Sequence, residues 1–109
     1  MKKVLFGLLL ACSVAHAEYD NGNKLLRDIE DPSANQRMYA LGYIIGVADT
    51  HENGNLCIPG TVTKGQLNDV VHQFLRGNPQ LRDLSADVLV LLALSEHWRC
   101  AQKGKKKSS

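Results

Sequence analysis

The sequence predicts an all-α fold, a small bundle of about four helices stapled by one disulfide. Apolar residues recur every three or four positions along most of the chain, and no segment keeps the period of two that marks a β-strand. Capping residues, glycines and prolines divide these runs into helix-sized pieces. The two cysteines beyond the N-terminal region, Cys57 and Cys100, are available for the staple.

The first 17 residues have the parts of a secretory signal peptide. Lys2 and Lys3 precede the apolar run VLFGLLLA, and the sequence AHA ending at Ala17 is the small-x-small pattern of a cleavage site. The apolar run is shorter than the ~20 residues that a membrane-spanning helix needs. We therefore expect export with cleavage after Ala17. A lipoprotein is the second interpretation, because LLAC ending at Cys12 resembles a lipobox.

Cleavage leaves 92 residues with two cysteines, Cys57 and Cys100. An even number of cysteines in a small exported domain predicts a disulfide. A domain of this size buries only a little over about 60% of its unfolded surface, so a cross-link is of value to its stability. Closing the 44-residue loop contributes on the order of 4 kcal/mol in the chain-entropy model.

The charge of the mature chain is unevenly distributed. It has 11 basic and 11 acidic residues, but four lysines lie in the tail KGKKK, which leaves 7 basic and 11 acidic residues in 18–102. A nucleic-acid partner is not expected, because it requires clustered Lys and Arg on the folded domain. We expect residues 18–102 to form the helical domain and residues 103–109 a disordered basic tail.

The first predicted helix covers NKLLRDIED, where Leu25, Leu26 and Ile29 share one side, and Pro32 ends it or starts the next.

The second predicted helix starts with Ser33 and Gln36, which have the spacing of a capping box. Gly42 and Gly46 lie one turn apart, and because glycine weakens a helix, the pair predicts a second helix that crosses closely there. Two glycines that the helix merely tolerates are the other interpretation. The helix should fade between Asp49 and Asn53. Its expected apolar stripe comprises Leu41, Ile44, Ile45 and Ala48.

The third predicted helix begins with a second capping box, Thr63 with Gln66, and ends at Gly77-Asn78-Pro79. The last begins near Asp83 or Ser85 and runs to about Cys100. Its segment VLVLLAL is apolar all round, so this helix is either the centre of the bundle or partly buried against a second copy of the chain.

The mature chain lacks the recognisable patterns of catalytic chemistry. Its histidines, His51, His72 and His97, are far apart, and the dipeptide HE at 51–52 has no second histidine to complete a zinc-protease motif. Both mature cysteines are used in the predicted disulfide and are not available as nucleophiles. We expect no enzymatic activity, no metal and no cofactor, and interpret the domain as a binding protein.

The motifs resemble, in order and spacing, those of the Tai and Rap immunity proteins of bacterial type VI secretion. The resemblance covers roughly residues 21–100 and includes LGYIIGVADT, CIPGTV, the QLNDVV helix and the closing HWRC, where family members often have a proline before the cysteine. The matching positions are Gly42, Tyr43, Gly46, Asp49, Cys57, Pro59, Gln66, Leu67, Val70, Pro79, Trp98 and Cys100.

The resemblance implies a periplasmic protein, expected to act as a homodimer, that occludes the cleft of a peptidoglycan amidase effector and protects the cell from its kin. Such inhibition requires a rigid protrusion, and the polar loop before Cys57 is the first choice because its far side is pinned. A plain solvated connection is the other interpretation of this loop, and Asp49 is alternatively a helix-end residue. The candidate effector-binding residues are Asp49, His51, Glu52, Asn53 and Asn55, and after them Asn78, Gln80 and Arg82.

A different class of protein also fits the general features of this sequence. Periplasmic acid-stress chaperones of the HdeA-like kind are small, helical, exported and closed by one disulfide. Such a protein loses its fold in strong acid and then protects other proteins from aggregation, which an immunity protein need not do. The two functions therefore predict different behaviour in acid.

Overall fold

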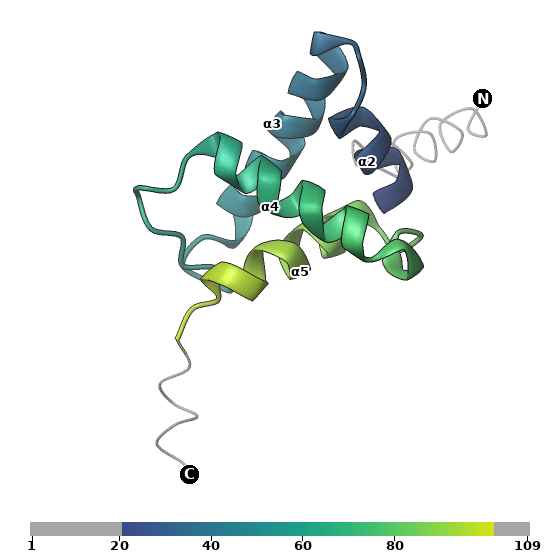
Figure 1. The fold of residues 1–109 in the computed structure, drawn as a ribbon. Helices are drawn as coiled ribbons and strands as arrows, with labels where there is room; N and C mark the ends of the chain where they lie inside the picture. The colour runs from purple at the N-terminus through teal and green to yellow at the C-terminus, as the bar shows by residue number, and fades with distance from the viewer. Residues whose placement is uncertain (1–20, 102–109) are drawn as a thin grey trace, which may run out of the picture.

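The computed structural model describes residues 21–101 and is a bundle of four α-helices with one short 3-10 turn (Figure 1). Residues 21–101 contain no strand, only two isolated β-bridges, and the predicted all-α fold is confirmed. The elements are α2 (Gly22–Ile29), α3 (Ala34–His51), α4 (Lys64–Gly77), η1 (Pro79–Leu81) and α5 (Ala86–Trp98).

Several predictions concern parts of the chain outside this range. The signal peptide, its cleavage site, Cys12 and the basic tail lie outside the described residues. Within 21–101, no helix is both long enough and apolar enough to cross a membrane.

Helix α5 contributes five buried side chains to the core of the bundle. It packs against α2, α3 and α4, and its buried side chains are fully inaccessible to solvent. The helix is nevertheless apolar on its outer side too, where Val88 and Leu92 are 44% and 43% exposed. The buried residues of α5 are Ala86, Leu89, Val90, Ala93 and Leu94.

The N-terminus of α2 docks onto the turn that leads into α5. The amides of Gly22 and Asn23 donate to the carbonyls of Leu84 and Arg82 over 3.1 and 3.0 Å. A Cβ on Gly22 would overlap the side chain of Leu89 and lie 3.1 Å from the Arg82 carbonyl oxygen. Only glycine allows this close approach between the two segments.

Helix α3 starts at the predicted place, but the predicted capping box is wrong. Ser33 is the N-cap residue, yet its side chain makes no cap hydrogen bond. The Ser33 amide donates instead to Asp31 Oδ1 over 2.8 Å, and Arg37 Nη1 donates to the Asp31 and Pro32 carbonyls. Asp31 therefore takes the role that the box would give to Gln36.

The buried side of α3 also differs from the prediction. Ile44 and Ala48 are buried as expected, together with Ala40, while Leu41 and Ile45 lie partly exposed at the edges. Gly42 and Gly46 face outward and would have no atom within 4 Å of an added Cβ. The predicted close crossing at the glycines is wrong within this chain, because the small residues on the packed side are the alanines.

Helix α4 follows its sequence signals closely. Its capping box is present: Thr63 Oγ1 accepts from the Gln66 amide over 3.1 Å, and Gln66 Oε1 accepts from the Thr63 amide over 2.7 Å. The apolar side of the helix buries Leu67, Val71 and Leu75, and Val70 and Phe74 are partly buried beside them.

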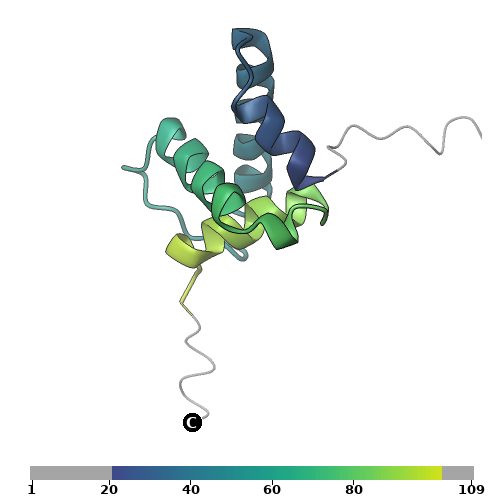
Figure 2. The same ribbon diagram turned by 45° about the vertical axis from the view of Figure 1, so that its right-hand side comes forward.

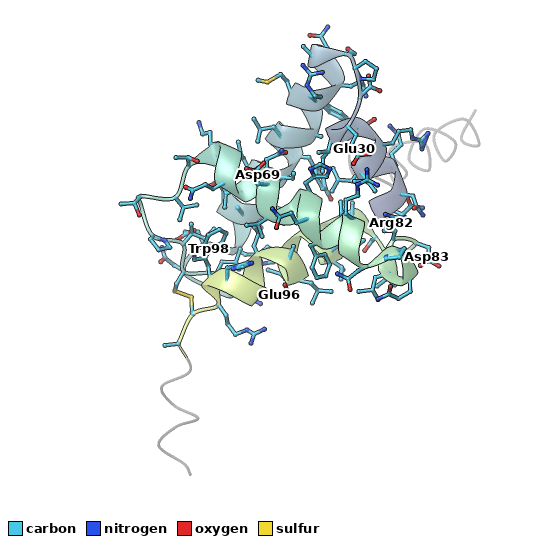
Figure 3. The ribbon with its side chains drawn as sticks, in the orientation of Figure 1. Glu30, Asp69, Arg82, Asp83, Glu96 and Trp98 are labelled. Atoms are coloured by element: carbon cyan, nitrogen blue, oxygen red, sulfur yellow. A yellow bond between two sulfur atoms is a disulfide. The ribbon has the colours of Figure 1, made fainter. Side chains whose placement is uncertain are left out.

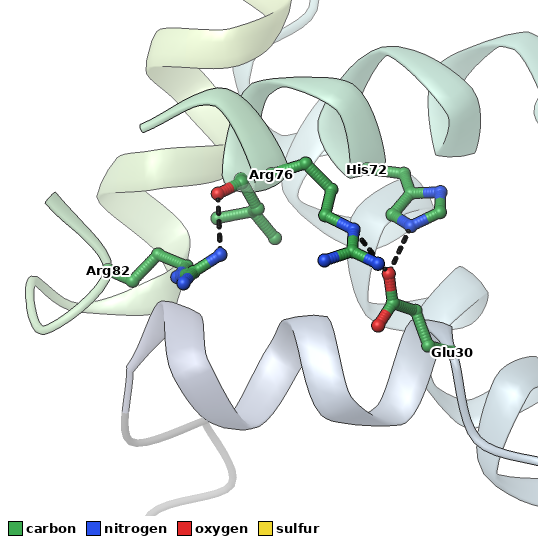
Figure 4. A network of polar contacts seen from close by, with 5 residues as sticks. Glu30, His72, Arg76 and Arg82 are labelled. Atoms are coloured by element: carbon green, nitrogen blue, oxygen red, sulfur yellow. Dashed lines mark hydrogen bonds and ion pairs between the residues drawn. The ribbon is translucent and has the colours of Figure 1, made fainter. Parts of the chain in front are cut away.

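A polar network joins α2 to α4 on the surface (Figure 4). Glu30 Oε2 accepts a hydrogen bond from His72 Nε2 over 2.7 Å and forms an ion pair with Arg76 Nε over 2.8 Å. The hydrogen bond from His72, and then the charge of Arg76, hold the pKa of the Glu30 carboxyl below its usual value. The carboxylate is therefore the favoured form in the folded protein.

Candidate functional site

The loop between α3 and Cys57 is a tight turn closed by its own backbone. We call residues 52–56 the anchored loop. The Asn53 amide donates to the Leu56 carbonyl over 2.7 Å, and the amides of Gly54 and Leu56 both donate to the His51 carbonyl over 3.0 Å. Asn53 has a φ of 66°, a left-handed conformation that asparagine tolerates better than most residues.

A buried side chain, two backbone hydrogen bonds and a disulfide hold this loop against the end of α5; the disulfide is seen near Trp98 in Figure 3. Leu56 is fully buried. The Cys57 amide donates to the Trp98 carbonyl over 2.8 Å, and the Cys100 amide donates to the Asn55 carbonyl over 3.2 Å. The predicted disulfide between Cys57 and Cys100 is confirmed, with the two Cα atoms 4.8 Å apart. This pairing requires extended backbone at Arg99, so α5 ends at Trp98 and not at Cys100.

The tip of the anchored loop presents polar groups to solvent. Asn53 and Asn55 are exposed, and neither side chain makes a hydrogen bond within residues 21–101. Glu52 is also exposed, but its Oε2 accepts from the Ile58 amide over 3.3 Å, so it also braces the chain behind the loop. Asp49 is exposed and His51 half-buried. The two asparagine amides are the groups here best placed to meet a partner.

The second predicted segment has a different character. Asn78 Nδ2 donates to the Phe74 carbonyl over 2.9 Å, and Gln80 Nε2 donates to Asn78 Oδ1 over 3.3 Å. Arg82 Nη1 donates to the Leu75 carbonyl over 3.0 Å (Figure 4), and its Nε is buried without a hydrogen-bond partner. These side chains hold the end of α4 and the turn around η1.

The two predicted segments are far apart. The anchored loop lies at the C-terminal end of α5, whereas η1 lies at its N-terminal end, as Figure 2 also shows. Helix α5 has 13 residues, which makes it about 20 Å long. The structure brings together Asp49, His51, Glu52, Asn53 and Asn55, and it keeps Asn78, Gln80 and Arg82 apart from them.

A surface on α3 adjoins the anchored loop, and the sequence interpretation missed it. Met38 and Tyr39 are the most exposed large apolar side chains among the described residues, at 63% and 59%. Gly42 and Gly46 form the floor of a hollow of about 420 Å³ on the same side, and one helical turn further lies Asp49. We call Met38, Tyr39, Gly42, Gly46 and Asp49 the α3 outer face. The glycine spacing was the available signal, because two glycines one turn apart leave the helix backbone open on one side.

A second depression lies between the anchored loop and α5. Its volume is about 430 Å³. The lining includes Gly54 and Asn55 from the loop and Leu91, Leu92, Ser95 and Arg99 from the α5 end. The anchored loop therefore lines this depression, whereas the hollow on α3 is lined by residues 42–50 of that helix alone.

The groups gathered around the anchored loop are suited to contacts by shape and hydrogen bonding rather than to metal or thiol chemistry. Within residues 21–101, no group of three or more His, Cys, Asp or Glu side chains is placed to hold a metal ion. Both described cysteines are in the disulfide. The surface consists of amides, exposed apolar side chains and glycines that let another backbone approach closely.

Comparison with known protein families matches residues 21–100 to the Rap1a immunity proteins. A search of curated proteins finds no match. The matched range includes all four described helices, the anchored loop and the disulfide. On this match, the chain belongs to the Rap1a immunity protein family.

Proposed function

We propose that this protein is a periplasmic immunity protein that inhibits a peptidoglycan amidase delivered by type VI secretion. It would bind the effector, occlude its active-site cleft and so protect the producing cell from itself and its kin. The observation that carries the proposal is the anchored loop, a rigid polar projection beside an exposed apolar face, in a member of an immunity protein family. The signal-peptide pattern supports export, and lipidation at Cys12 is the alternative route to the same compartment.

The anchored loop is suited to fill a groove. Its conformation is fixed before binding by Leu56, the disulfide and the backbone pairing to the α5 end. A loop that is already ordered loses little conformational entropy on binding. The amides of Asn53 and Asn55 each offer hydrogen-bond donors and an acceptor, which suits them to polar catalytic groups at the bottom of a cleft.

The α3 outer face extends the proposed contact beyond the loop. Met38 and Tyr39 offer large, flexible or aromatic side chains, the kinds that often dominate the energy of an interface. Gly42 and Gly46 leave a hollow in which a helix or loop of the effector can approach the α3 backbone. The contact is then broad enough to explain inhibition without catalytic groups.

The residues around η1 are assigned a structural role. The side chains of Asn78 and Arg82 donate to carbonyls of α4, and the Arg82 carbonyl also accepts from the α2 backbone. Gln80 is bonded to Asn78. We therefore place effector binding at the other end of α5.

The proposal includes a homodimer as the acting form. The exposed apolar side of α5 supports self-association, and the effector is contacted through the anchored loop and the α3 outer face of each copy.

The test is inhibition of the amidase encoded beside this gene, measured on peptidoglycan fragments with increasing amounts of the protein. We expect complete inhibition at a stoichiometric ratio. Asn53→Gly removes the side-chain amide but accepts the positive φ, so together with Asn55→Ala it should weaken inhibition by about 10-fold to 100-fold. Gln80→Ala is the matched polar control and should inhibit like the wild type. If no neighbouring amidase is bound or inhibited, the proposal fails.

An acid aggregation assay separates this function from that of an acid-stress chaperone. An immunity protein has no reason to suppress the aggregation of unrelated proteins at strongly acidic pH. Suppression in acid together with a lack of effector binding would favour the chaperone.

A further inference from the structure

The depression between the anchored loop and α5 has the make-up of a binding site. We call it the loop hollow. Its volume of about 430 Å³ lies within the range of known ligand sites, which combine apolar walls with a few polar groups. Leu91 and Leu92 supply the apolar wall of the loop hollow, and Asn55, Ser95 and Arg99 supply its polar side chains.

The three polar side chains of this lining have no partner among the described residues. Asn55, Ser95 and Arg99 make no side-chain hydrogen bond or ion pair within residues 21–101. Asn55 and Arg99 are exposed, and Ser95 is half-buried. Each of them can therefore bond to another molecule without breaking a bond within this domain. The guanidinium group of Arg99 is suited to a carboxylate, which it can bind through two parallel hydrogen bonds.

Backbone pairing fixes the position of Arg99 beside the anchored loop. Arg99 forms an isolated antiparallel bridge with Leu56, and the amide of the next residue, Cys100, donates to the Asn55 carbonyl over 3.2 Å. Cys100 is also bonded to Cys57 through the disulfide. The backbone that carries the guanidinium group is therefore ordered before binding, which lowers the entropy cost of a contact there.

We infer that the loop hollow receives an acidic segment of the effector, whose carboxylate pairs with Arg99 while an apolar neighbour contacts Leu91 and Leu92. The inference rests on the proposed function and deepens it by naming the chemistry of the partner. Gly54 and Asn55 belong both to the anchored loop and to the lining of the hollow. An effector that surrounds the tip of the loop therefore covers the loop hollow as well.

The distribution of charge indicates an acidic segment. Among the residues of 21–101 that line the loop hollow, none is acidic and Arg99 alone is charged. Residues 95–107 contain five lysines and arginines and one acid, Glu96, whereas residues 18–102 have an excess of acids, with 7 basic and 11 acidic groups. This end of the chain therefore attracts an acidic surface. An effector that covers the hollow also excludes water, which strengthens an ion pair that would be weak in solvent.

Inhibition of the amidase encoded beside this gene tests the role of Arg99. Arg99→Gln should raise the inhibition constant about 10-fold, because it removes the charge. Arg99→Glu should raise it at least about 100-fold, because two carboxylates then meet. Arg27→Glu is the matched control and should inhibit like the wild type. It makes the same change of charge at an exposed residue of α2, the helix whose N-terminus docks at the other end of α5.

The salt dependence of binding distinguishes a charge contact from a structural role of Arg99. The affinity of the wild type should fall more steeply with rising salt concentration than the affinity of Arg99→Gln. Circular dichroism and thermal melting check that each variant is folded.

Cross-linking identifies the segment that occupies the loop hollow. A photoreactive amino acid in place of Ser95 should cross-link to the effector. Mass spectrometry of the product should place the cross-link at an aspartate or glutamate that has an apolar neighbour. An arginine in place of that acid in the effector should restore inhibition by Arg99→Glu.

Three outcomes would overturn this inference alone. In the first, the wild type inhibits the amidase and Arg99→Glu inhibits it equally well. In the second, the cross-linked segment of the effector has no acid. In the third, the cross-link joins two copies of this chain, so that the loop hollow lies in a contact between copies. A wild type that neither binds nor inhibits the amidase would refute the proposed function, and this inference with it.

Discussion

The backbone amide of Cys57 donates to the carbonyl of Trp98 over 2.8 Å. This bond holds the anchored loop to the end of α5 independently of the sulfur atoms, and the Cys100 amide adds a second bond to Asn55 over 3.2 Å. The disulfide is therefore built onto a backbone pairing that exists without it. Its main effect should be on the unfolded chain, where it closes a loop between residues 43 positions apart.

The first prediction concerns this cross-link. Cys57→Ser combined with Cys100→Ser should lower the free energy of unfolding by up to about 4 kcal/mol, because the unfolded chain regains its loop entropy. Guanidinium denaturation followed by circular dichroism measures the change. The helical content of the folded variant should match that of the wild type.

Reduction is the control. The wild type in excess reductant and the double serine variant should have the same unfolding midpoint. Equal midpoints of wild type and variant under oxidising conditions would contradict the prediction.

The second prediction compares two glycines. Gly22→Ala should destabilise the protein by about 1–3 kcal/mol, because the new Cβ would overlap Leu89 and approach the Arg82 carbonyl. Gly42→Ala is the matched change in an open position, with nothing within 4 Å of the Cβ, and should stabilise by up to about 1 kcal/mol. Thermal melting of both variants checks the signs. If both shifted the melting temperature in the same direction, the packing argument for Gly22 would be wrong.

The contrast between α3 and α4 shows how much of the fold the sequence could predict. The Thr63 and Gln66 capping box of α4 depends on four neighbouring residues, and it formed as predicted. The same sequence pattern at Ser33 makes no capping box, because the Ser33 amide donates to the Asp31 side chain and not to Gln36. Whether the side of α3 with Gly42 and Gly46 is buried or exposed depends on how α3 packs against α2, α4 and α5. No local sequence pattern determines which side of α3 faces the other helices.

The candidate site was predictable to a similar extent. The anchored loop was identified because glycine, asparagine and a cysteine with a distant partner mark a pinned turn. The residues of 78–82 have an equally polar composition, and only the structure shows that Asn78 and Arg82 bond to carbonyls of α4. The exposure of Met38 and Tyr39 likewise follows from tertiary packing. Composition does not distinguish a polar group that binds a partner from one that holds a turn.

The third prediction concerns the pH dependence of stability. The folded protein lowers the pKa of Glu30 below its ordinary value of 4.5 through the hydrogen bond from His72 and the charge of Arg76. The carboxylate therefore stabilises the fold above pH 4.5, and this contribution is lost as the pH falls below 4.5 through the lower pKa of the folded state. Glu30→Gln should lower stability at neutral pH by no more than about 1 kcal/mol, since the group is partly solvated.

Urea denaturation at pH values between neutral and strongly acidic measures this effect. The difference between the wild type and Glu30→Gln should shrink as the pH falls below 4.5. Asp69→Asn is the matched control, an exposed acid on α4 that has no ion pair within residues 21–101. A pH-independent difference for Glu30→Gln would show that the network does not stabilise the carboxylate.

The last prediction separates effector binding from folding on α3. Gly46 is exposed, and an added Cβ would meet no atom within 4 Å, so Gly46→Leu should fold with little loss of stability. Its side chain would fill the hollow of the α3 outer face and hold the effector away, which should weaken inhibition of the amidase by about 100-fold. Gly60→Leu is the matched control, because Gly60 is equally open and lies outside both the anchored loop and the α3 outer face. Inhibition constants and melting temperatures of the two variants decide the question. If both variants inhibit like the wild type, the effector does not cover the α3 outer face, and the contact is restricted to the anchored loop.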